Sequence, residues 1–140
     1  MKVYLTRRYG FSASHRLHSV QLSDEENRIT YGKCNNPFGH GHNYFIEITI
    51  SGQVDPLTGM VCNLADLDGW VRDNVLERYD HQNLNHLTEF AEKVSTTENL
   101  CVEIYELLHR GFTHAHLERV RIEETMMNSF EYSGEAPALR

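Results

Sequence analysis

One segment of the sequence, Tyr44-Phe45-Ile46-Glu47-Ile48-Thr49-Ile50, alternates between two kinds of side chain. The tyrosine and the isoleucines fall on one side of an extended chain, whereas Phe45, Glu47 and Thr49 fall on the other, because successive side chains of a strand point to opposite faces. This alternation predicts a half-buried strand, and therefore a sheet that is covered on its apolar face.

Other segments extend the sheet around this strand. Residues 3–14 are rich in β-branched and aromatic side chains and predict an opening strand, and residues 120–122 and 130–132 predict closing strands. The turn-forming residues 55–59 predict a hairpin that joins the central strand to residues 60–62. We expect these strands to form an antiparallel sheet.

Two helices are expected between the strands. Asn63 can cap a helix over residues 64–76, where apolar residues recur at helical spacing. Ser95 and Glu98 match the capping-box pattern and predict a second helix that ends near Arg110. The order of elements favours one α+β domain over residues 1–140, with helices on one face of the sheet. The bare edges of such a sheet favour oligomerisation.

The composition argues against several classes of protein. A formal net charge of −7 disfavours a nucleic-acid partner, because binding phosphates over a whole surface needs an excess of Lys and Arg. No apolar run approaches the roughly 20 residues that span a bilayer, so we expect no membrane protein. Residues 1–8 lack the apolar stretch of a secretion signal, and three cysteines without a Cys-x-x-Cys pair fit reduced thiols. We therefore expect a cytoplasmic protein.

Histidines supply the first candidates for chemistry, since the chain contains nine of them. His40 and His42 precede the central strand, and at a spacing of two both imidazoles should leave the same face. His15, at the end of the opening strand, can join them if the two strands are neighbours. Three imidazoles suit Zn²⁺ and leave a fourth tetrahedral position for water or substrate. Alternatively, each histidine is an ordinary core or surface residue.

Cys34 is the second candidate. It lies in residues 31–40, a segment dense in turn formers that ends at His40, and such a loop can hold a thiol over a metal ion. Two other interpretations stay open. The thiol is a small buried apolar group, which is the common fate of a free cysteine, or it is a fourth zinc ligand that closes the site and makes it structural.

Five motifs together resemble the 6-pyruvoyl-tetrahydropterin synthase family over nearly the whole chain. They are Phe11-Ser12-Ala13-Ser14-His15-Arg16-Leu17, Gly32-Lys33-Cys34-Asn35-Asn36-Pro37 leading into Gly39-His40-Gly41-His42-Asn43-Tyr44, Asn63-Leu64-Ala65-Asp66-Leu67, Asp80-His81-Gln82-Asn83-Leu84 and Ser95-Thr96-Thr97-Glu98-Asn99. The resemblance implies a tunnelling fold (T-fold), in which a four-stranded antiparallel sheet carries two helices. It also implies trimers that close a twelve-stranded β-barrel and stack in pairs as a homohexamer.

The same resemblance implies an enzyme. His15, His40 and His42 would bind one Zn²⁺ per subunit, and the substrate would be 7,8-dihydroneopterin triphosphate. The product would be 6-pyruvoyl-tetrahydropterin, formed by a carbon–oxygen lyase that eliminates triphosphate. Zinc bound to the side-chain hydroxyls of the substrate would acidify the neighbouring protons, and Cys34 would be the base that removes them.

Two further positions have roles implied by the resemblance. Asp80 would stabilise the imidazolium of His81, which would form a proton-transfer relay with Cys34. Because adjacent residues of a strand point in opposite directions, Asp80 reaches His81 only if the chain turns there. Glu124 would anchor the pterin by accepting two parallel hydrogen bonds from the ring. Without the resemblance, Asp80-His81 is a solvated turn, and Glu124 is an ordinary exposed acid beside Glu123.

Polar residues are also expected around the two ends of the substrate. Thr96, Thr97 and Glu98 are implied contacts of the polar edge of the pterin, although Glu98 is alternatively a helix cap. An acidic protein that holds a triphosphate needs local positive charge, and Mg²⁺ is a further candidate partner of the phosphates. The basic residues that should gather near the site are Arg16, Arg28 or Lys33.

Two rival functions remain open. The sister activity, 6-carboxy-5,6,7,8-tetrahydropterin synthase of queuosine biosynthesis, uses the same zinc and cysteine but expels acetaldehyde. Its members usually have a shorter gap between the cysteine and His-x-His than the five residues that separate Cys34 from His40. The other rival, from a different class, is a non-catalytic protein in which Cys34 and the three histidines hold a structural zinc ion.

Overall fold

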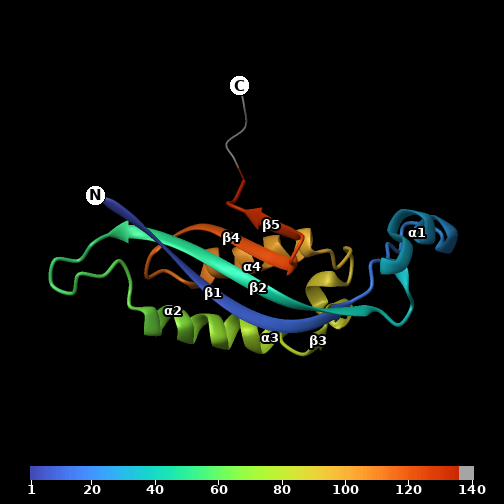
Figure 1. Ribbon diagram of the computed structural model, residues 1–140, viewed down its shortest axis with the longest axis horizontal. Coiled ribbons are helices and arrows are strands. Elements are labelled where there is room, and N and C mark those ends of the chain that lie inside the picture. The colour runs from blue at the N-terminus through green and yellow to red at the C-terminus, as the bar shows by residue number, and fades with distance from the viewer. Residues whose placement is uncertain (136–140) are drawn as a thin grey trace, which may run out of the picture.

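The computed structural model of the chain describes residues 1–135. Its centre is a twisted sheet in the order β3-β1-β2-β4-β5, in which β1, β2, β4 and β5 are antiparallel neighbours and the short β3 runs parallel to β1 (Figure 1). The strands are β1 (Lys2–His15), β2 (His40–Gln53), β3 (Gln82–Asn83), β4 (His116–Thr125) and β5 (Asn128–Tyr132).

Two long helical stretches cover one face of this sheet. The first consists of α2 (Leu64–Val71), a π-helical segment (Arg72–Leu76) and α3 (Glu77–Tyr79), and the second is α4 (Thr97–Gly111). A separate short helix, α1 (Asp24–Tyr31), projects at the end of the molecule where β1 ends and β2 begins (Figure 1). Three 3₁₀ turns complete the described fold: Gly32–Asn35, Leu84–His86 and Thr88–Phe90.

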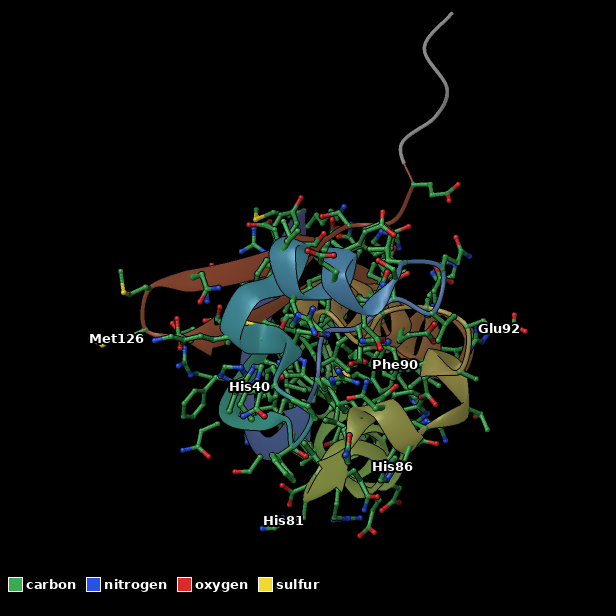
Figure 2. All side chains as sticks on the ribbon, turned by 90° about the vertical axis from the view of Figure 1, so that its right-hand side faces the viewer. His40, His81, His86, Phe90, Glu92 and Met126 are labelled. Carbon is green, nitrogen blue, oxygen red and sulfur yellow. The ribbon has the colours of Figure 1, made fainter. Side chains whose placement is uncertain are left out.

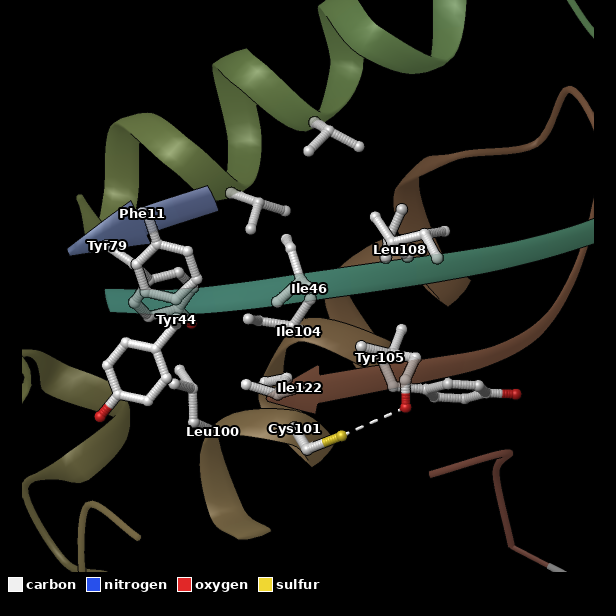
Figure 3. Packing of buried hydrophobic residues seen from close by; sticks show 14 of the residues in the cluster. Phe11, Tyr44, Ile46, Tyr79, Leu100, Cys101, Ile104, Tyr105, Leu108 and Ile122 are labelled. Atoms are coloured by element: carbon white, nitrogen blue, oxygen red, sulfur yellow. Dashed lines mark hydrogen bonds between the residues drawn. The ribbon is translucent and has the colours of Figure 1, made fainter. Parts of the chain in front are cut away.

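The core lies between the sheet and these two helical stretches (Figure 3). The apolar side chains of β2 expected from the alternation, Tyr44, Ile46, Ile48 and Ile50, are completely buried there. They pack with residues of α4 such as Ile104 and Leu108. The opposite face of the sheet carries polar and charged side chains, including a set of ion pairs that joins Arg8, Glu47, Arg121 and Glu123.

The structure confirms the α+β class, the order of the long elements and the placement of both helices on one face. β1 is one residue longer at each end than residues 3–14, and both closing strands are present. Asn63 caps α2 as expected, because its side chain accepts a hydrogen bond from the backbone N–H of Ala65 (2.9 Å). No helix in residues 1–135 is long and apolar enough to cross a membrane.

The predicted hairpin to residues 60–62 is wrong. The turn itself is present, since Asp55 N–H donates to the carbonyl of Met60 (3.0 Å) and Gly59 N–H to that of Asp55 (2.7 Å). Residues 60–62 form no strand, however, and the chain continues into α2. The physical reason is that both edges of β2 are already taken, one by β1 over its whole length and the other by β4.

The predicted capping box at Ser95 and Glu98 is also wrong. The N-cap of α4 is Thr96, whose hydroxyl accepts from the backbone N–H of Asn99 (3.2 Å). Ser95 is buried and its carbonyl oxygen is bound to His15, so the helix begins one residue later than the pattern indicated. A true capping box does exist at Ser23 and Glu26, where it starts a helix that the apolar periodicity did not predict.

Candidate metal centre and active site

The pairing of β1 with β2 builds the three-histidine cluster. In the antiparallel register His15 lies opposite His40, and Ala13 lies opposite His42. All three imidazoles therefore share one face of the sheet, and one ligand nitrogen from each lies within 4.8 Å of the others. The ring centroids are 4.6 Å (His15–His40), 4.9 Å (His40–His42) and 5.2 Å (His15–His42) apart. This is the convergence that the sequence required of a metal site.

Hydrogen bonding and burial prepare these nitrogens to bind a metal ion. His15 Nδ1 donates to the carbonyl of Ser95 (2.7 Å), which leaves the lone pair on Nε2. The Nε2 atoms of His15 and His42 are buried without a hydrogen-bond partner in the described residues. Burial also lowers the pKa of both rings, which favours their neutral, metal-binding form. Unpartnered buried imidazole nitrogens fit a divalent cation that prefers nitrogen ligands.

Cys34 lies in the 3₁₀ turn Gly32–Asn35 and is half-buried. The turn is fixed against the segment that follows β1, because Leu17 N–H donates to the carbonyl of Cys34 (2.9 Å). Within residues 1–135, the group of ligand atoms that lie within 4.8 Å of one another contains the three histidines but not this thiol. The geometry gives no support to a closed site with four protein ligands.

The chain turns sharply at His81, as the Asp80–His81 pair required. His81 has a backbone φ of +60°, which is unusual for a residue other than glycine. Its Nδ1 lies 3.0 Å from Asp80 Oδ1, and its backbone N–H donates to the carbonyl of Ser12 (2.6 Å). The backbone N–H of Ser12 in turn donates to Asp80 (2.9 Å), and this bond, supported by His81, lowers the pKa of the Asp80 carboxyl. Asp80 is thus a fixed anion beside an imidazole.

The His81 ring itself projects outward. Its side chain is 82% exposed, and it lies at the rim of the end of the molecule that also carries His40 (Figure 2). His81 and the metal-site residue His42 line the same open cavity of about 560 Å³. Cys34 is not part of the wall of this cavity. One chain therefore places His81 near the histidine cluster without joining it to the thiol.

Glu124 is close to the histidines and has specific partners. The Thr97 hydroxyl donates to its Oε2, and Asn128 Nδ2 donates to its Oε1 (3.2 Å). Its Oε2 lies 4.0 Å from His42 Nε2, and its side chain is only 16% exposed. Glu123 lies instead on the charged face of the sheet, 2.7 Å from Arg8. The structure thus separates two carboxylates that are neighbours in the sequence.

The other two residues expected at the pterin edge lie differently. The hydroxyl of Thr96 is engaged in capping α4, and Glu98 is exposed in the first turn of that helix. Thr97 is buried and is the member of this group that the structure brings to Glu124.

Sequence reasoning missed the residues that hold the loops of the site. Asn85 accepts from the backbone N–H of Arg16 (2.7 Å) and donates to its carbonyl (2.8 Å), which ties the segment after His15 to the 3₁₀ turn Leu84–His86. Asn35 is buried and donates to the carbonyl of Leu17 (2.7 Å). Isolated asparagines carry no periodic signal, so only the folded chain identifies them. Tyr44, whose buried hydroxyl has no hydrogen-bond partner within residues 1–135, could have been found because it shares the strand face of His42.

The basic residues expected near the site do gather. Arg16, Arg28 and Lys33 line one cavity of about 500 Å³ between α1 and the turn that carries Cys34. The cavity is therefore next to the histidine cluster along the chain, since Arg16 follows His15 directly.

The fold and the site together define a class of protein. An antiparallel sheet with two helical stretches on one face, and three histidines converging at the end of its first two long strands, is a tunnelling-fold domain with a candidate metal centre.

Comparison with known proteins narrows this class to a family. The chain belongs to the 6-pyruvoyl tetrahydropterin synthase family, whose family model matches residues 4–135. It is 50% identical over 133 residues to the 6-pyruvoyl tetrahydrobiopterin synthase of Poecilia reticulata, covering 94% of this chain and 90% of that protein. The human protein of that name is 48% identical over 132 residues, covering 94% and 91% respectively. The solved structure of Caenorhabditis elegans 6-pyruvoyl tetrahydropterin synthase has a TM-score of 0.92 and 44% identity, covering 96% of this chain and 97% of that one.

Proposed function

We propose that this protein is a zinc-dependent lyase that converts 7,8-dihydroneopterin triphosphate to 6-pyruvoyl-tetrahydropterin and releases triphosphate. Relatives that are 50% and 48% identical to this chain are named for this activity. The observation that carries the proposal is the cluster of His15, His40 and His42, in which two Nε2 atoms are buried with no hydrogen-bond partner in the described part of the chain. Family membership and this cluster together support an enzyme with a metal-assisted reaction.

Zinc is the metal that the ligand set fits best. Three imidazoles supply three of the four ligands of a tetrahedral catalytic site and leave the fourth position for a substrate oxygen. When bound, zinc supplies Lewis-acid polarisation of the substrate's side-chain oxygens. The buried Ser95 carbonyl holds His15 in the tautomer that presents Nε2.

Cys34 is the proposed base that accepts a proton from the substrate side chain. The Asp80–His81 pair is the proposed partner in proton transfer, because Asp80 is a fixed anion whose Oδ1 lies 3.0 Å from His81 Nδ1. His81 is largely exposed, and Cys34 does not line the cavity of His81. Cys34, Asp80 and His81 therefore act as one relay only when the substrate or a neighbouring subunit bridges the gap between Cys34 and His81.

Glu124 is the proposed anchor of the pterin ring. Its carboxylate is half-enclosed by Thr97 and Asn128 and lies within reach of the metal site. A carboxylate in this place can accept two hydrogen bonds from the amino group and ring N–H of a pterin. Thr97 orients the carboxylate, and Thr96 and Glu98 remain predicted contacts of the pterin edge.

Three wider expectations belong to the same proposal. The active form is a homohexamer of two stacked trimers, each closing a twelve-stranded barrel, because the two outer strands β3 and β5 leave open edges in one chain. Mg²⁺ accompanies the triphosphate, whose oxygens it prefers. The cytoplasm is the proposed location, supported by three cysteines that are all free thiols.

The product identifies the reaction. Incubation of the zinc-loaded protein with dihydroneopterin triphosphate should yield 6-pyruvoyl-tetrahydropterin and triphosphate, detected by chromatography and mass spectrometry. The variant Cys34→Ala should keep its zinc and lose turnover, because the thiol is a base and not a ligand. A carboxy-pterin released with acetaldehyde would instead assign the sister activity, and loss of zinc from Cys34→Ala would favour the structural site.

A further inference from the structure

A basic cavity lies beside the candidate metal centre and has no part in the proton chemistry described above. It has a volume of about 500 Å³ and lies between α1, the segment after β1 and the turn Gly32–Asn35. It is lined by Arg16, His18, Asp24, Arg28, Gly32, Lys33, Asn35, Asn36 and Pro37. Three cationic side chains thus face one carboxylate, so the cavity is positive in a chain whose formal net charge is −7.

These three cations differ from most others in the protein because they have no carboxylate within 4.0 Å in residues 1–135. The Lys and Arg side chains that do have one are Lys2, Arg7, Arg8, Arg72, Arg78, Lys93 and Arg121. Besides the cavity residues, only Arg110 and Arg119 in the described chain lack such a partner. Unpaired cations that lie close together repel one another, and a bound anion offsets this repulsion.

The walls of the cavity are held by buried polar side chains. Asn35, which is 4% exposed, donates to the carbonyl of Leu17 (2.7 Å), and its own carbonyl accepts from Arg16 Nε (2.9 Å). Asn35 Nδ2 also donates to His18 Nδ1 (3.0 Å), which leaves the proton of this imidazole on Nε2 as a further donor. The arrangement is therefore built before any ligand arrives, which reduces the entropy lost on binding.

The second wall, α1, is fixed in a similar way. Asn27 is completely buried and accepts from the backbone N–H of Ser19 (2.7 Å). It also donates to the carbonyls of Ser19 (2.9 Å) and Ser23 (3.0 Å). These bonds hold the helix that carries Arg28 over the end of the molecule where His40 lies (Figure 2).

The position of the cavity relates it to the reaction. Arg16 directly follows His15 of the histidine cluster, and Lys33 directly precedes Cys34. The cavity and the candidate active site are therefore built from neighbouring residues of the same two segments, the end of β1 and the turn Gly32–Asn35. The side chain of the proposed substrate ends in a triphosphate, an anionic group that suits a positive cavity.

We propose that Arg16, Arg28 and Lys33 form an oligophosphate-binding subsite that holds the triphosphate of the substrate before its elimination. This inference rests on the proposed function for the identity of the ligand. Guanidinium groups match phosphate oxygens bidentately, and Lys33 adds a compact positive charge. By stabilising the departing triphosphate, the same three residues would also favour the bond cleavage that releases it.

Inorganic triphosphate is the probe that tests the subsite without chemistry. Isothermal titration of the zinc-loaded protein should detect its binding, and Arg28→Gln should weaken that binding about tenfold, the usual effect of losing one charged hydrogen-bond donor. Arg28→Lys should restore part of the affinity. Arg110→Gln is the matched control, because Arg110 is also unpaired but lies in the last turn of α4, about 20 Å along the helix from Thr97.

Kinetics with the substrate distinguish binding at this subsite from a general effect of removing one positive charge from the protein. Arg28→Gln should raise the KM for dihydroneopterin triphosphate by a similar factor, and it should leave the binding of dihydroneopterin without phosphates unchanged. Equal affinity of Arg28→Gln and the unmodified protein for triphosphate would overturn the proposal, as would an equal loss in Arg110→Gln. Circular dichroism of each variant verifies that α1 and the sheet are retained.

Failure of this inference and failure of the proposed function give different results. If the protein forms the pyruvoyl product while Arg28→Gln binds triphosphate normally, the function stands and the subsite is wrong. If triphosphate binding depends on Arg28 but no pterin product forms, the phosphate-binding subsite is supported and the proposed function is wrong. The natural ligand of the subsite is then a different phosphate compound.

Discussion

At the scale of single residues, strand geometry places the adjacent carboxylates of Glu123 and Glu124 in different surroundings. Glu123 and Glu124 point to opposite faces of β4. Glu123 pairs with Arg8 on the charged face, whereas Glu124 meets Thr97 near His42. The resemblance implied Glu124 as the pterin anchor, and the strand register distinguishes its surroundings from those of Glu123.

The different surroundings of the two carboxylates allow the proposed role of Glu124 to be tested, with Glu123 as the matched control. Glu124→Gln should raise the KM for the pterin substrate on the order of tenfold or more, because a charged hydrogen-bond acceptor is lost from the site. Glu123→Gln should change KM by less than about twofold, since an exposed ion pair contributes little. Steady-state kinetics on both variants measures this. Equal effects of the two substitutions would remove Glu124 from the pterin site.

At the scale of elements, α1 is held by one polar side chain and not by an apolar face. Its single buried residue is Asn27, which bonds to the loop before the helix. This is why apolar periodicity could not predict α1. The capping box at Ser23 and Glu26 was the available signal, and it lay in a segment without an apolar pattern.

Asn27→Ala should therefore loosen α1 without unfolding the sheet. The substitution removes the side-chain hydrogen bonds that Asn27 makes to the backbone of Ser19 and Ser23, at a cost of about 1–3 kcal/mol. Hydrogen exchange should become faster in residues 19–31 and stay unchanged in β1 and β2. Ile29→Ala is the control, because Ile29 is 78% exposed. Unchanged exchange in Asn27→Ala would show that other contacts hold the helix.

The segment that carries Asp80 and His81 is fixed by a second polar cluster. Glu89, in the 3₁₀ turn Thr88–Phe90, accepts from Arg78 Nε (2.6 Å), Arg78 Nη2 (2.8 Å) and the Tyr79 hydroxyl (2.8 Å). Burial alone would raise the pKa of Glu89, but the bonds from Arg78 and Tyr79 outweigh it and lower the pKa to about 2. The cluster thus joins the end of α3 to the turns that follow β3.

The depressed pKa of Glu89 predicts a pH dependence of stability. Because the folded pKa lies below the ordinary value of 4.5, the stabilisation is fully present above about pH 4.5 and is lost as the pH falls toward 2. Glu89→Gln should consequently lose less stability between pH 7 and pH 3 than the unmodified protein. Denaturant unfolding at both values measures this, with Glu92→Gln as an exposed control. The same acid loss in Glu89→Gln and the unmodified protein would contradict it.

At the scale of the whole molecule, the outer strands of the sheet determine how chains can associate. β3 has two residues and β5 has five, and both leave one edge of the sheet open in a single chain. The proposed trimers close these edges into a barrel.

The mass in solution tests this assembly. Sedimentation equilibrium should give about 98 kDa, six times the chain mass of 16.3 kDa. A concentration-independent mass of one chain would contradict both the barrel and the hexamer.

Much of this molecule could be predicted from sequence because its long elements follow simple periods. β2 alternates strictly, and the helix after Asn63 repeats its apolar residues at helical spacing. The convergence of His15 with His40 and His42 followed once β1 was placed beside β2. The first two inferences depend on local geometry alone, whereas the third also needs the pairing of β1 with β2.

The remainder depends on tertiary contacts that no local pattern encodes. Residues 60–62 had turn signals before them but no free strand edge to join. Ser95 resembled a helix cap, yet its carbonyl accepts a hydrogen bond from His15, which is 80 residues away in the sequence. Cys34 and His81 likewise lie in different surroundings in the described chain, a separation that no local sequence pattern predicted.

The central claim is that three imidazoles hold one zinc ion and leave a position open beside a thiol that is not a ligand. Zinc K-edge X-ray absorption on the zinc-loaded protein tests it most directly. The account predicts three nitrogen ligands and one oxygen at about 2.0–2.1 Å, with no sulfur in the coordination shell. A sulfur ligand at about 2.3 Å, lost in Cys34→Ala, would contradict it.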